Sequence, residues 1–216
     1  MIAIVAALLA APVTLQADPV HSSASFSVKH MMVSTVRGEF TKLSSTLVWD
    51  KTDPAKSSVE AKIDAASVDT HNEKRDGHLK SPDFFDAAKC PDITFKSNKV
   101  QKAGGNKYKV SGDLTMHCVT KPVTLQAEAT GPVKGMSGAN SYGVSATGTV
   151  SRKDFGLVWN KALEAGGVAV GDEVKLNLDL EYTDAPAAAK SQTKAETKAD
   201  DKAEAKDGAK AETDKK

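Results

Sequence analysis

Histidine and cysteine, the side chains that most often do chemistry, are sparse in this 216-residue chain: it holds five histidines and two cysteines. Their spacing matches none of the zinc signatures H-x-x-x-H, C-x-x-C or H-E-x-x-H. Neither a G-x-S-x-G elbow nor a glycine-rich phosphate loop is present. Four residues would make a metal site only if the fold brought them together: His78, Cys90, His117 and Cys118. We therefore predict no catalytic residue, no cofactor and no metal site.

Five polar residues could instead pair with a polar ligand group: His30, Arg75, Asp76, His78 and Arg152. His30 shares the alternation of Phe26 and Val28 and should point to the same apolar face. An arginine can pair bidentately with a pyrophosphate or a carboxylate. The structural alternatives are a hydrogen-bonded core histidine, an Arg–Asp pair that fixes its own loop, and an Arg152 that ties Asp154 or the helical insertion described below.

The elements that must position these residues are strands, because apolar side chains recur at every second position through most of the chain. We predict eight strands, with a β-bulge near Lys42 in the second: 24–32, 36–49, 59–63, 93–100, 108–116, 122–129, 142–150 and 174–182. One apolar and one polar face per strand favour antiparallel pairing. Eight such strands can close into a barrel that holds one small ligand, although a two-sheet sandwich predicts the same alternation.

One polar segment breaks the alternation and reads as a short helix from Thr70 to Lys80. Thr70 and Glu73 have the spacing of a capping box. A second short turn should carry Phe84 and Phe85, and we expect this insertion to lie over one end of the barrel.

The two ends of the chain differ from the middle. Residues 1–17 carry no charge and include the apolar run 2–11, which is typical of a signal peptide cleaved after Ala17. The alternative is a buried first strand or helix. Residues 185–216 hold eight Lys, seven acidic residues and no apolar side chain larger than Ala, so we predict a disordered tail. The remaining 18–184 make one domain.

The amino-acid composition limits the kinds of partner that we expect. A net charge of +1 gives no reason to expect nucleic acid as a partner. After signal cleavage no apolar stretch is long enough to anchor the chain in a membrane. We therefore expect a periplasmic protein.

The two cysteines flank a hairpin. Cys90 precedes Gly104 by fourteen residues and Cys118 follows it by fourteen, which brings them nearly opposite each other. The apolar alternation favours a register that differs by one residue. A disulfide and two free buried thiols both remain open at this point.

Several motifs, in order and covering residues 21–182, resemble the YceI, or polyisoprenoid-binding, family. They include Phe26-Ser-Val-Lys-His30-Met, Val36-Arg-Gly-Glu-Phe40, Arg75-Asp-Gly-His-Leu79, Pro91-Asp-Ile-Thr-Phe95, Gly112-Asp-Leu-Thr-Met-His117, Val119-Thr-Lys-Pro-Val123 and Ser151-Arg-Lys-Asp-Phe-Gly156. That family often has Tyr at position 90 and usually Gly at 118. Because both departures are cysteines at facing ends of one hairpin, the resemblance favours the disulfide.

The resemblance implies an all-β, eight-stranded antiparallel lipocalin-like barrel, often a homodimer, whose interior holds a polyisoprenoid, an isoprenoid quinone or a similar lipid. The apolar wall would comprise Phe26, Val28, Met32, Val36, Phe40, Phe84, Phe85, Ile93, Phe95, Leu114, Met116, Val123 and Phe155. The five polar residues named above would meet the head group. The competing functions are a lipid-modifying esterase or isomerase, with His30 or His78 as base, and an outer-membrane barrel with its apolar face outside.

Overall fold

The computed structural model describes residues 11–135, 138–164 and 166–184. The first ten residues of the predicted signal peptide and the whole predicted tail, 185–216, lie outside the described residues. Most of the described chain forms strands, joined by one α-helix and three short 3₁₀ turns. The elements are β1 (Val13–Ala17), β2 (Ser23–His30), β3 (Ser34–Phe40), β4 (Leu43–Trp49), η1 (Pro54–Lys56), β5 (Ser58–Asp64), η2 (Ala65–Ser67), β6 (Val68–Asp69), α1 (Glu73–Lys80), β7 (Asp92–Gly104), β8 (Lys107–Met116), β9 (Val119–Lys134), β10 (Asn140–Ser151), η3 (Arg152–Phe155) and β11 (Val170–Asp184).

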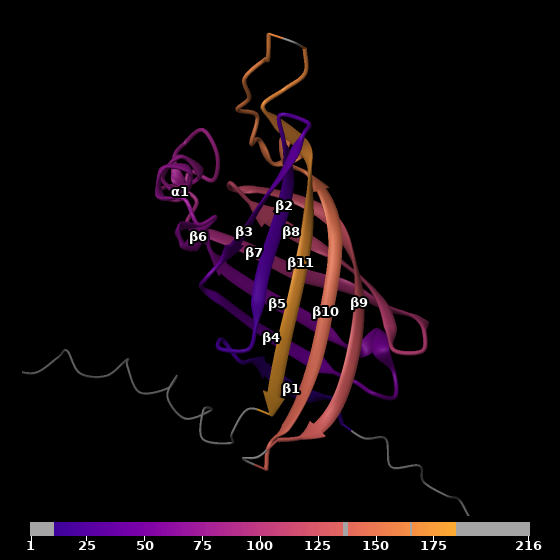
Figure 1. The fold of residues 1–216 in the computed structure, drawn as a ribbon. Coiled ribbons are helices and arrows are strands. Elements are labelled where there is room, and N and C mark those ends of the chain that lie inside the picture. Colours follow the sequence, from indigo (N-terminus) through magenta and orange to yellow (C-terminus); the bar gives the residue numbers. More distant parts are fainter. Residues whose placement is uncertain (1–10, 136–137, 165, 185–216) are drawn as a thin grey trace, which may run out of the picture. The chain divides into compact units, whose positions relative to one another are not determined.

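The strands form one antiparallel sheet that closes into a barrel (Figure 1). Along one edge of β11, its residues 182–184 pair with β1 and its residues 170–179 pair with β2. Strands β1 and β2 therefore act as one interrupted strand. In the same way β3 continues into β4 and β5 into β6, because β2 pairs with β3, β1 with β4, β4 with β5 and β3 with β6. The eight-stranded antiparallel barrel is therefore confirmed, and the break after Phe40 lies where the bulge near Lys42 is predicted.

The barrel includes residues that precede the domain start predicted at residue 18. Strand β1 lies between β4 and β11, and the side chain of Leu15 is completely buried. Cleavage after Ala17 would remove the strand that joins β4 to β11, and β2 would still join β11 to β3. The signal peptide and its cleavage site stay predictions. The alternation of these five residues is too short to separate from the apolar run that precedes them.

The strands curve where small residues let side chains cross the sheet. Gly38 on β3 is paired with Phe26 on β2, and a Cβ on Gly38 would lie 2.6 Å from the end of the Phe26 ring. Because glycine carries no side chain, the phenyl ring can lie flat across the neighbouring strand. This packing helps to direct Phe26 along the inside of the barrel.

The helical insertion begins later than predicted. Asn72, not Thr70, caps α1, and its side chain accepts a hydrogen bond from the backbone N–H of Arg75 at 3.0 Å. Thr70 instead donates its backbone N–H and its hydroxyl to the buried carboxylate of Asp76, at 2.9 and 2.5 Å. The capping-box prediction is wrong because the threonine hydroxyl is bonded to Asp76, six residues along the chain.

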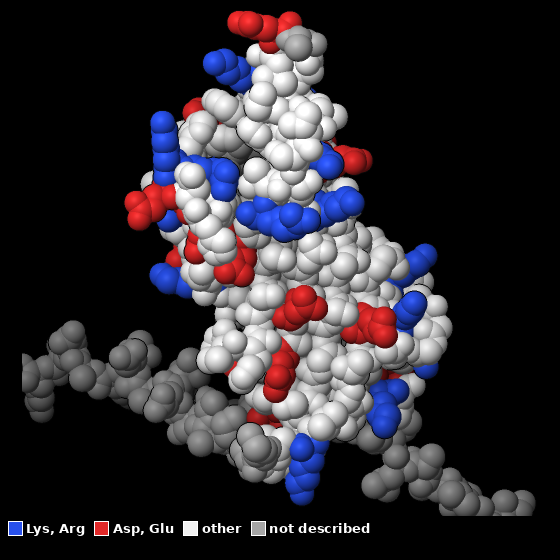
Figure 2. Space-filling view, viewed as in Figure 1, with Lys and Arg blue, Asp and Glu red and all other residues white. Residues whose placement is uncertain are grey.

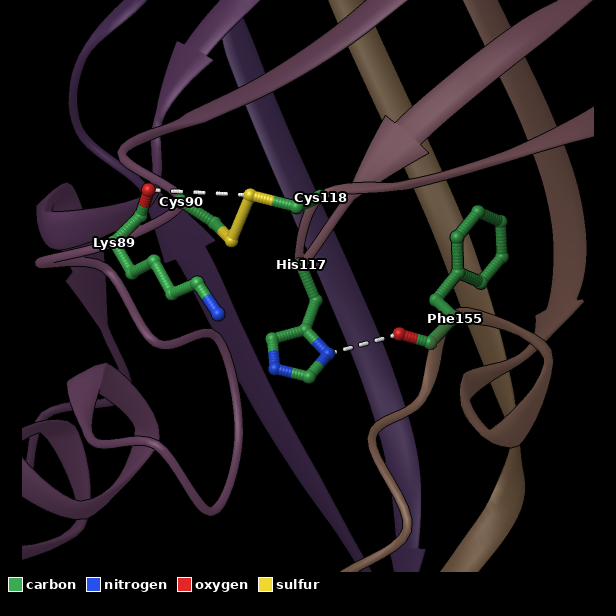
Figure 3. Close-up of a disulfide and its surroundings, with 5 residues drawn as sticks. All are labelled: Lys89, Cys90, His117, Cys118 and Phe155. Atoms are coloured by element: carbon green, nitrogen blue, oxygen red, sulfur yellow. Dashed lines mark hydrogen bonds between the residues drawn. A yellow bond between two sulfur atoms is a disulfide. The ribbon is translucent and has the colours of Figure 1, made fainter.

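The disulfide between Cys90 and Cys118 is confirmed, with Cα atoms 5.4 Å apart (Figure 3). Pairing of Phe95 with Leu114 puts the strands in the register that the apolar alternation favours, one residue away from direct opposition of the cysteines. Cys118 and His117 form the tight turn between β8 and β9, both at positive φ. The adjacent His117 Nδ1 lies 3.0 Å from the carbonyl oxygen of Phe155. This turn is therefore joined to the segment after α1 on one side and to η3 on the other.

We expect the Cys90→Ser/Cys118→Ser double variant to lose about 3–4 kcal/mol of the free energy of unfolding, because the bond closes a loop with a sequence separation of 28 residues. Urea unfolding of the oxidised protein and the variant measures this difference. Wild type reduced with dithiothreitol should match the variant. Equal stability of the oxidised protein and the variant would contradict the prediction.

Candidate ligand-binding cavity

The barrel encloses a cavity of about 240 Å³. Its wall is almost wholly apolar and is built from the inward side chains of the strands, with contributions from α1 and from the segments around η3. An engineered apolar cavity of about 150 Å³ stays dry and binds benzene. The interior is thus suited to hold an apolar group, and charged side chains lie on the outside (Figure 2). That distribution is the reverse of a transmembrane barrel's.

Ten of the thirteen residues predicted for the wall lie on it: Phe26, Val28, Phe40, Phe84, Phe85, Ile93, Phe95, Leu114, Met116 and Val123. Val36 is half-buried and Phe155 is fully buried, but neither belongs to the described wall. Met32 is 63% exposed, so its predicted place on the wall is wrong. Strand β2 ends at His30, and the alternation that includes Met32 runs past the end of the strand into a turn.

The wall also includes residues that the prediction left out. The largest group comes from β4 and β11, whose alternation is as regular as that of the predicted strands: Leu43, Leu47, Trp49, Leu176, Leu178, Leu180 and Tyr182. Their periodicity was a sufficient signal. Leu157 lies outside any regular pattern, and only the packing of its loop brings it to the wall. Val170 begins β11, four residues before the predicted strand.

A chain of aromatic rings joins the insertion to the barrel. The ring of Phe40 lies 5.7 Å from that of Phe26 and 5.5 Å from that of Phe85. Leu79 of α1 and Phe84 also reach the wall. The segment around α1 therefore covers part of the cavity, as the sequence predicts.

Arg152 is the one predicted head-group residue on the cavity wall, and its guanidinium is already fully engaged. A guanidinium has five N–H donors. Arg152 donates to Gly171 O, Leu157 O, Trp159 O, Val170 O and Asp172 Oδ1. Burial lowers the pKa of Arg152, and the carboxylate of Asp172 partly opposes that shift. Arg152 thus holds the segment between η3 and β11, and the predicted partner Asp154 is replaced by Asp172.

The other four predicted head-group residues are not on the described wall: His30, Arg75, Asp76 and His78. Arg75 donates to the hydroxyl and the carbonyl of Thr70, at 2.7 and 2.8 Å, so it supports the same residue as Asp76. His78 Nε2 lies 2.9 Å from Asp83 Oδ2, and its ring packs edge-on against the rings of Phe84 and Trp159. These polar groups fix the loops around one end of the cavity rather than line it.

The comparisons with known proteins agree with this architecture, since residues 15–182 match the YceI-like domain. The chain belongs to the YceI-like family. A UPF0312 protein of Staphylococcus aureus strain N315 is 39% identical over 167 residues, which are 77% of this chain and 95% of that protein.

Solved structures give the same result. The Campylobacter jejuni YceI protein is 34% identical with a TM-score of 0.62, over 72% of this chain and 88% of that one. Burkholderia cenocepacia BcnA is 27% identical with a TM-score of 0.68, over 76% and 98%. A polyisoprenoid binding domain from Saccharophagus degradans, 18% identical with a TM-score of 0.58 over 80% and 99%, shares the fold.

This YceI-like barrel has a buried polar contact that sequence reasoning missed. The hydroxyl groups of Ser45 and Tyr182 lie 2.7 Å apart, and the Ser45 hydroxyl donates to the carbonyl oxygen of Glu60 at 2.9 Å. Tyr182 is 1% exposed, and burial raises the pKa of its phenol while the hydrogen bond to Ser45 opposes the shift. Both residues lie on the cavity wall.

The described residues show neither a metal cluster nor a membrane-spanning helix. No group of three or more His, Cys, Asp or Glu side chains in this part of the chain could hold a metal ion. The cysteines of the conceivable metal cluster are bonded to each other. Among the described helices, none is long and apolar enough to cross a membrane.

We expect Arg152→Met to lower the free energy of unfolding by about 3–5 kcal/mol, because it leaves the carboxylate and four carbonyls without their donors. Lys153→Met is the matched control: the neighbouring Lys153 binds the same carboxylate at 2.7 Å but is 49% exposed. That variant should change stability by about 0.5 kcal/mol or less. Urea unfolding measures both, and equal effects would refute the role given to Arg152.

We expect the stability contributed by Tyr182 to fall as the pH rises through about 10. Because burial raises the pKa of the folded phenol, the unfolded chain loses this proton first, and deprotonation then favours unfolding. Tyr182→Phe should cost about 1 kcal/mol near neutral pH, through the lost hydrogen bond, and less at alkaline pH. Ser45→Ala keeps the phenol and should keep the alkaline loss. Urea unfolding at both pH values checks this, and a pH-independent cost of Tyr182→Phe would disprove it.

Proposed function

We propose that this protein is a binding protein and carrier that holds the apolar chain of a long lipid inside the barrel. The proposal is based on the cavity, a void of about 240 Å³ that is lined by residues from strands around the whole barrel. A barrel interior packed solid would serve stability alone. A void that is retained inside an apolar wall costs stability, and a bound apolar group restores the lost contacts.

The chemistry of the wall favours a ligand recognised by its apolar chain. Burial contributes about 0.8 kcal/mol per methylene, or about 8 kcal/mol for ten, before the costs of association. Arg152, the charged residue on the described wall, has no donor left for a ligand. A polyisoprenoid, an isoprenoid quinone or a similar amphiphile fits this description. One protein of the same fold is described as a polyisoprenoid binding domain.

The esterase or isomerase alternative is less well supported by the geometry. It requires a general base within reach of a ligand in the cavity. His30 and His78, the predicted bases, do not belong to the described wall, and His78 is engaged with Asp83. We therefore propose stoichiometric binding without turnover.

Export to the periplasm is part of the proposal, and the disulfide supports it because such bonds persist in oxidising compartments. A signal peptide would have to be cleaved before Val13, since β1 belongs to the barrel. A homodimer is proposed on the family resemblance.

We expect the full-length protein, purified without detergent, to carry one lipid per barrel, detected by native mass spectrometry and identified after organic extraction. Stripped protein should rebind a long polyprenol. An empty protein that also refuses both an added polyprenol and an isoprenoid quinone would contradict the proposal.

We further expect Ala146→Phe to lower polyprenol affinity at least about tenfold, because Ala146 and its cross-strand partner Ala127 both lie on the wall and the ring would fill the void. Thr147→Phe is the matched control, since Thr147 is the next residue of β10 and is exposed. Circular dichroism should show that both variants fold. Equal affinities of the two variants would place the ligand elsewhere.

A further inference from the structure

One end of the barrel exposes three consecutive apolar side chains. They form the turn between β2 and β3, where Met31, Met32 and Val33 are 45%, 63% and 83% exposed. We call Met31–Val33 the apolar tip. The backbone N–H of Met31 donates to the carbonyl of Ala169 at 2.8 Å, so the tip is attached to the segment that leads into β11. Figure 2 shows an uncharged area at this end, between a few charged side chains at its extreme tip and a band of Lys and Arg.

The backbone conformation of this turn does not favour these residues. Met31 and Met32 have φ values of 49° and 62°, and the N–H of Val33 bonds to the carbonyl of His30 at 3.1 Å. Two central residues at positive φ favour asparagine and glycine and strain methionine. Exposed methionines here serve neither the turn nor the core. Local rules are broken in this way mostly at functional positions.

A row of cations lies directly behind the apolar tip. Register puts Arg37 and Lys175 on either side of Ser27 on the outer face, and Lys29 is next to them on β2. All three are exposed, and none forms a salt bridge within the described residues. Figure 2 shows a band of Lys and Arg crossing the surface below the uncharged end, with acidic residues farther along the barrel.

The spacing of the apolar tip and the cations matches the layers of a lipid leaflet. At about 3.3 Å per strand residue, Lys29 lies about 7 Å behind Met31, and Arg37 about 13 Å behind Val33. Interfacial apolar groups insert about 5–10 Å into the boundary of head groups and acyl chains. With the tip inserted, the cations lie at or just above the phosphates. Each would strengthen binding to an anionic surface by about fivefold.

The cavity begins close behind the same tip. Val28 on β2, three residues before Met31, belongs to the cavity wall. Val170 at the start of β11 also belongs to the wall and directly follows Ala169, the residue that bonds to Met31. We propose that this end of the barrel docks on an anionic lipid bilayer, with Met31–Val33 inserted and Lys29, Arg37 and Lys175 on the phosphates. The inference rests on the proposed function, since docking puts the cavity end against the source of its lipid.

Flotation of the full-length protein with lipid vesicles tests this inference. The protein should bind vesicles of phosphatidylcholine with phosphatidylglycerol, and bind pure phosphatidylcholine at least about tenfold more weakly. Met31→Asn/Met32→Asn should reduce binding to the anionic vesicles about tenfold, and the variant should fold at least as stably because asparagine suits positive φ. Lys29→Glu/Arg37→Glu should abolish the preference for anionic vesicles.

The matched controls change the same residue types elsewhere. Val133→Asn alters an apolar side chain that is 66% exposed near the end of β9, and Lys109→Glu reverses an exposed charge near the start of β8. Neither should affect flotation. Full binding by Met31→Asn/Met32→Asn, or no binding by the wild type, would overturn the docking proposal.

A parallel measurement of polyprenol binding by native mass spectrometry separates the two proposals. A wild type that binds polyprenol but does not float refutes docking and leaves the carrier function intact. A wild type that floats through the tip but binds neither polyprenol nor isoprenoid quinone supports docking and refutes the carrier function. If sedimentation velocity shows a dimer that Met31→Asn/Met32→Asn dissociates, without vesicle binding, the tip is a contact between copies and the proposal fails.

Discussion

Closure of the sheet is the constraint on which the rest of the structure depends. Strand β11 pairs with β10 along one edge and with β2 and β1 along the other, so both edges of this last strand are covered. Closure removes exposed edges and turns one face of each strand inward. Because the sequence makes that face apolar, the interior becomes a cavity with an apolar wall. The contact between β1 and β11 is well packed, with Leu15 and Tyr182 almost completely buried.

The polar residues near the cavity stabilise the loops around it. Arg152 uses all five donors on the segment after η3 and on the start of β11. Asp76 and Arg75 both bind Thr70, and the disulfide joins the segment after α1 to the turn between β8 and β9. Buried charges and polar groups are costly unless they are paired. Here the pairing also fixes loops that contribute Leu157, Phe84 and Phe85 to the wall. The barrel therefore presents an incoming ligand with apolar surface.

A cavity that recognises an apolar chain must receive its lipid from a membrane, because a long lipid is insoluble in water. A barrel that offers an apolar tip, a row of cations and a cavity in succession along β2 meets this requirement in geometric terms. Binding at the membrane surface would let the apolar chain pass between two apolar environments without crossing bulk water. The strained methionine turn and the void inside the barrel then have one explanation.

The sequence by itself indicated the eight strands and most of their inward residues, because a period of two is a local feature. The joining of Cys90 to Cys118 is favoured by the hairpin together with the family resemblance, and the structure confirms it. The sequence also indicated that an insertion with Phe84 and Phe85 covers part of the cavity. Only the tertiary structure decided where the barrel begins, since β1 is recognised by its partners β4 and β11 and not by its own five residues. It also decided the roles of Met32 and Arg152. Alternation no longer shows which face a side chain is on once its strand ends, as at Met32 after β2. The partners of Arg152 are mostly carbonyl groups that only the folded loops bring together.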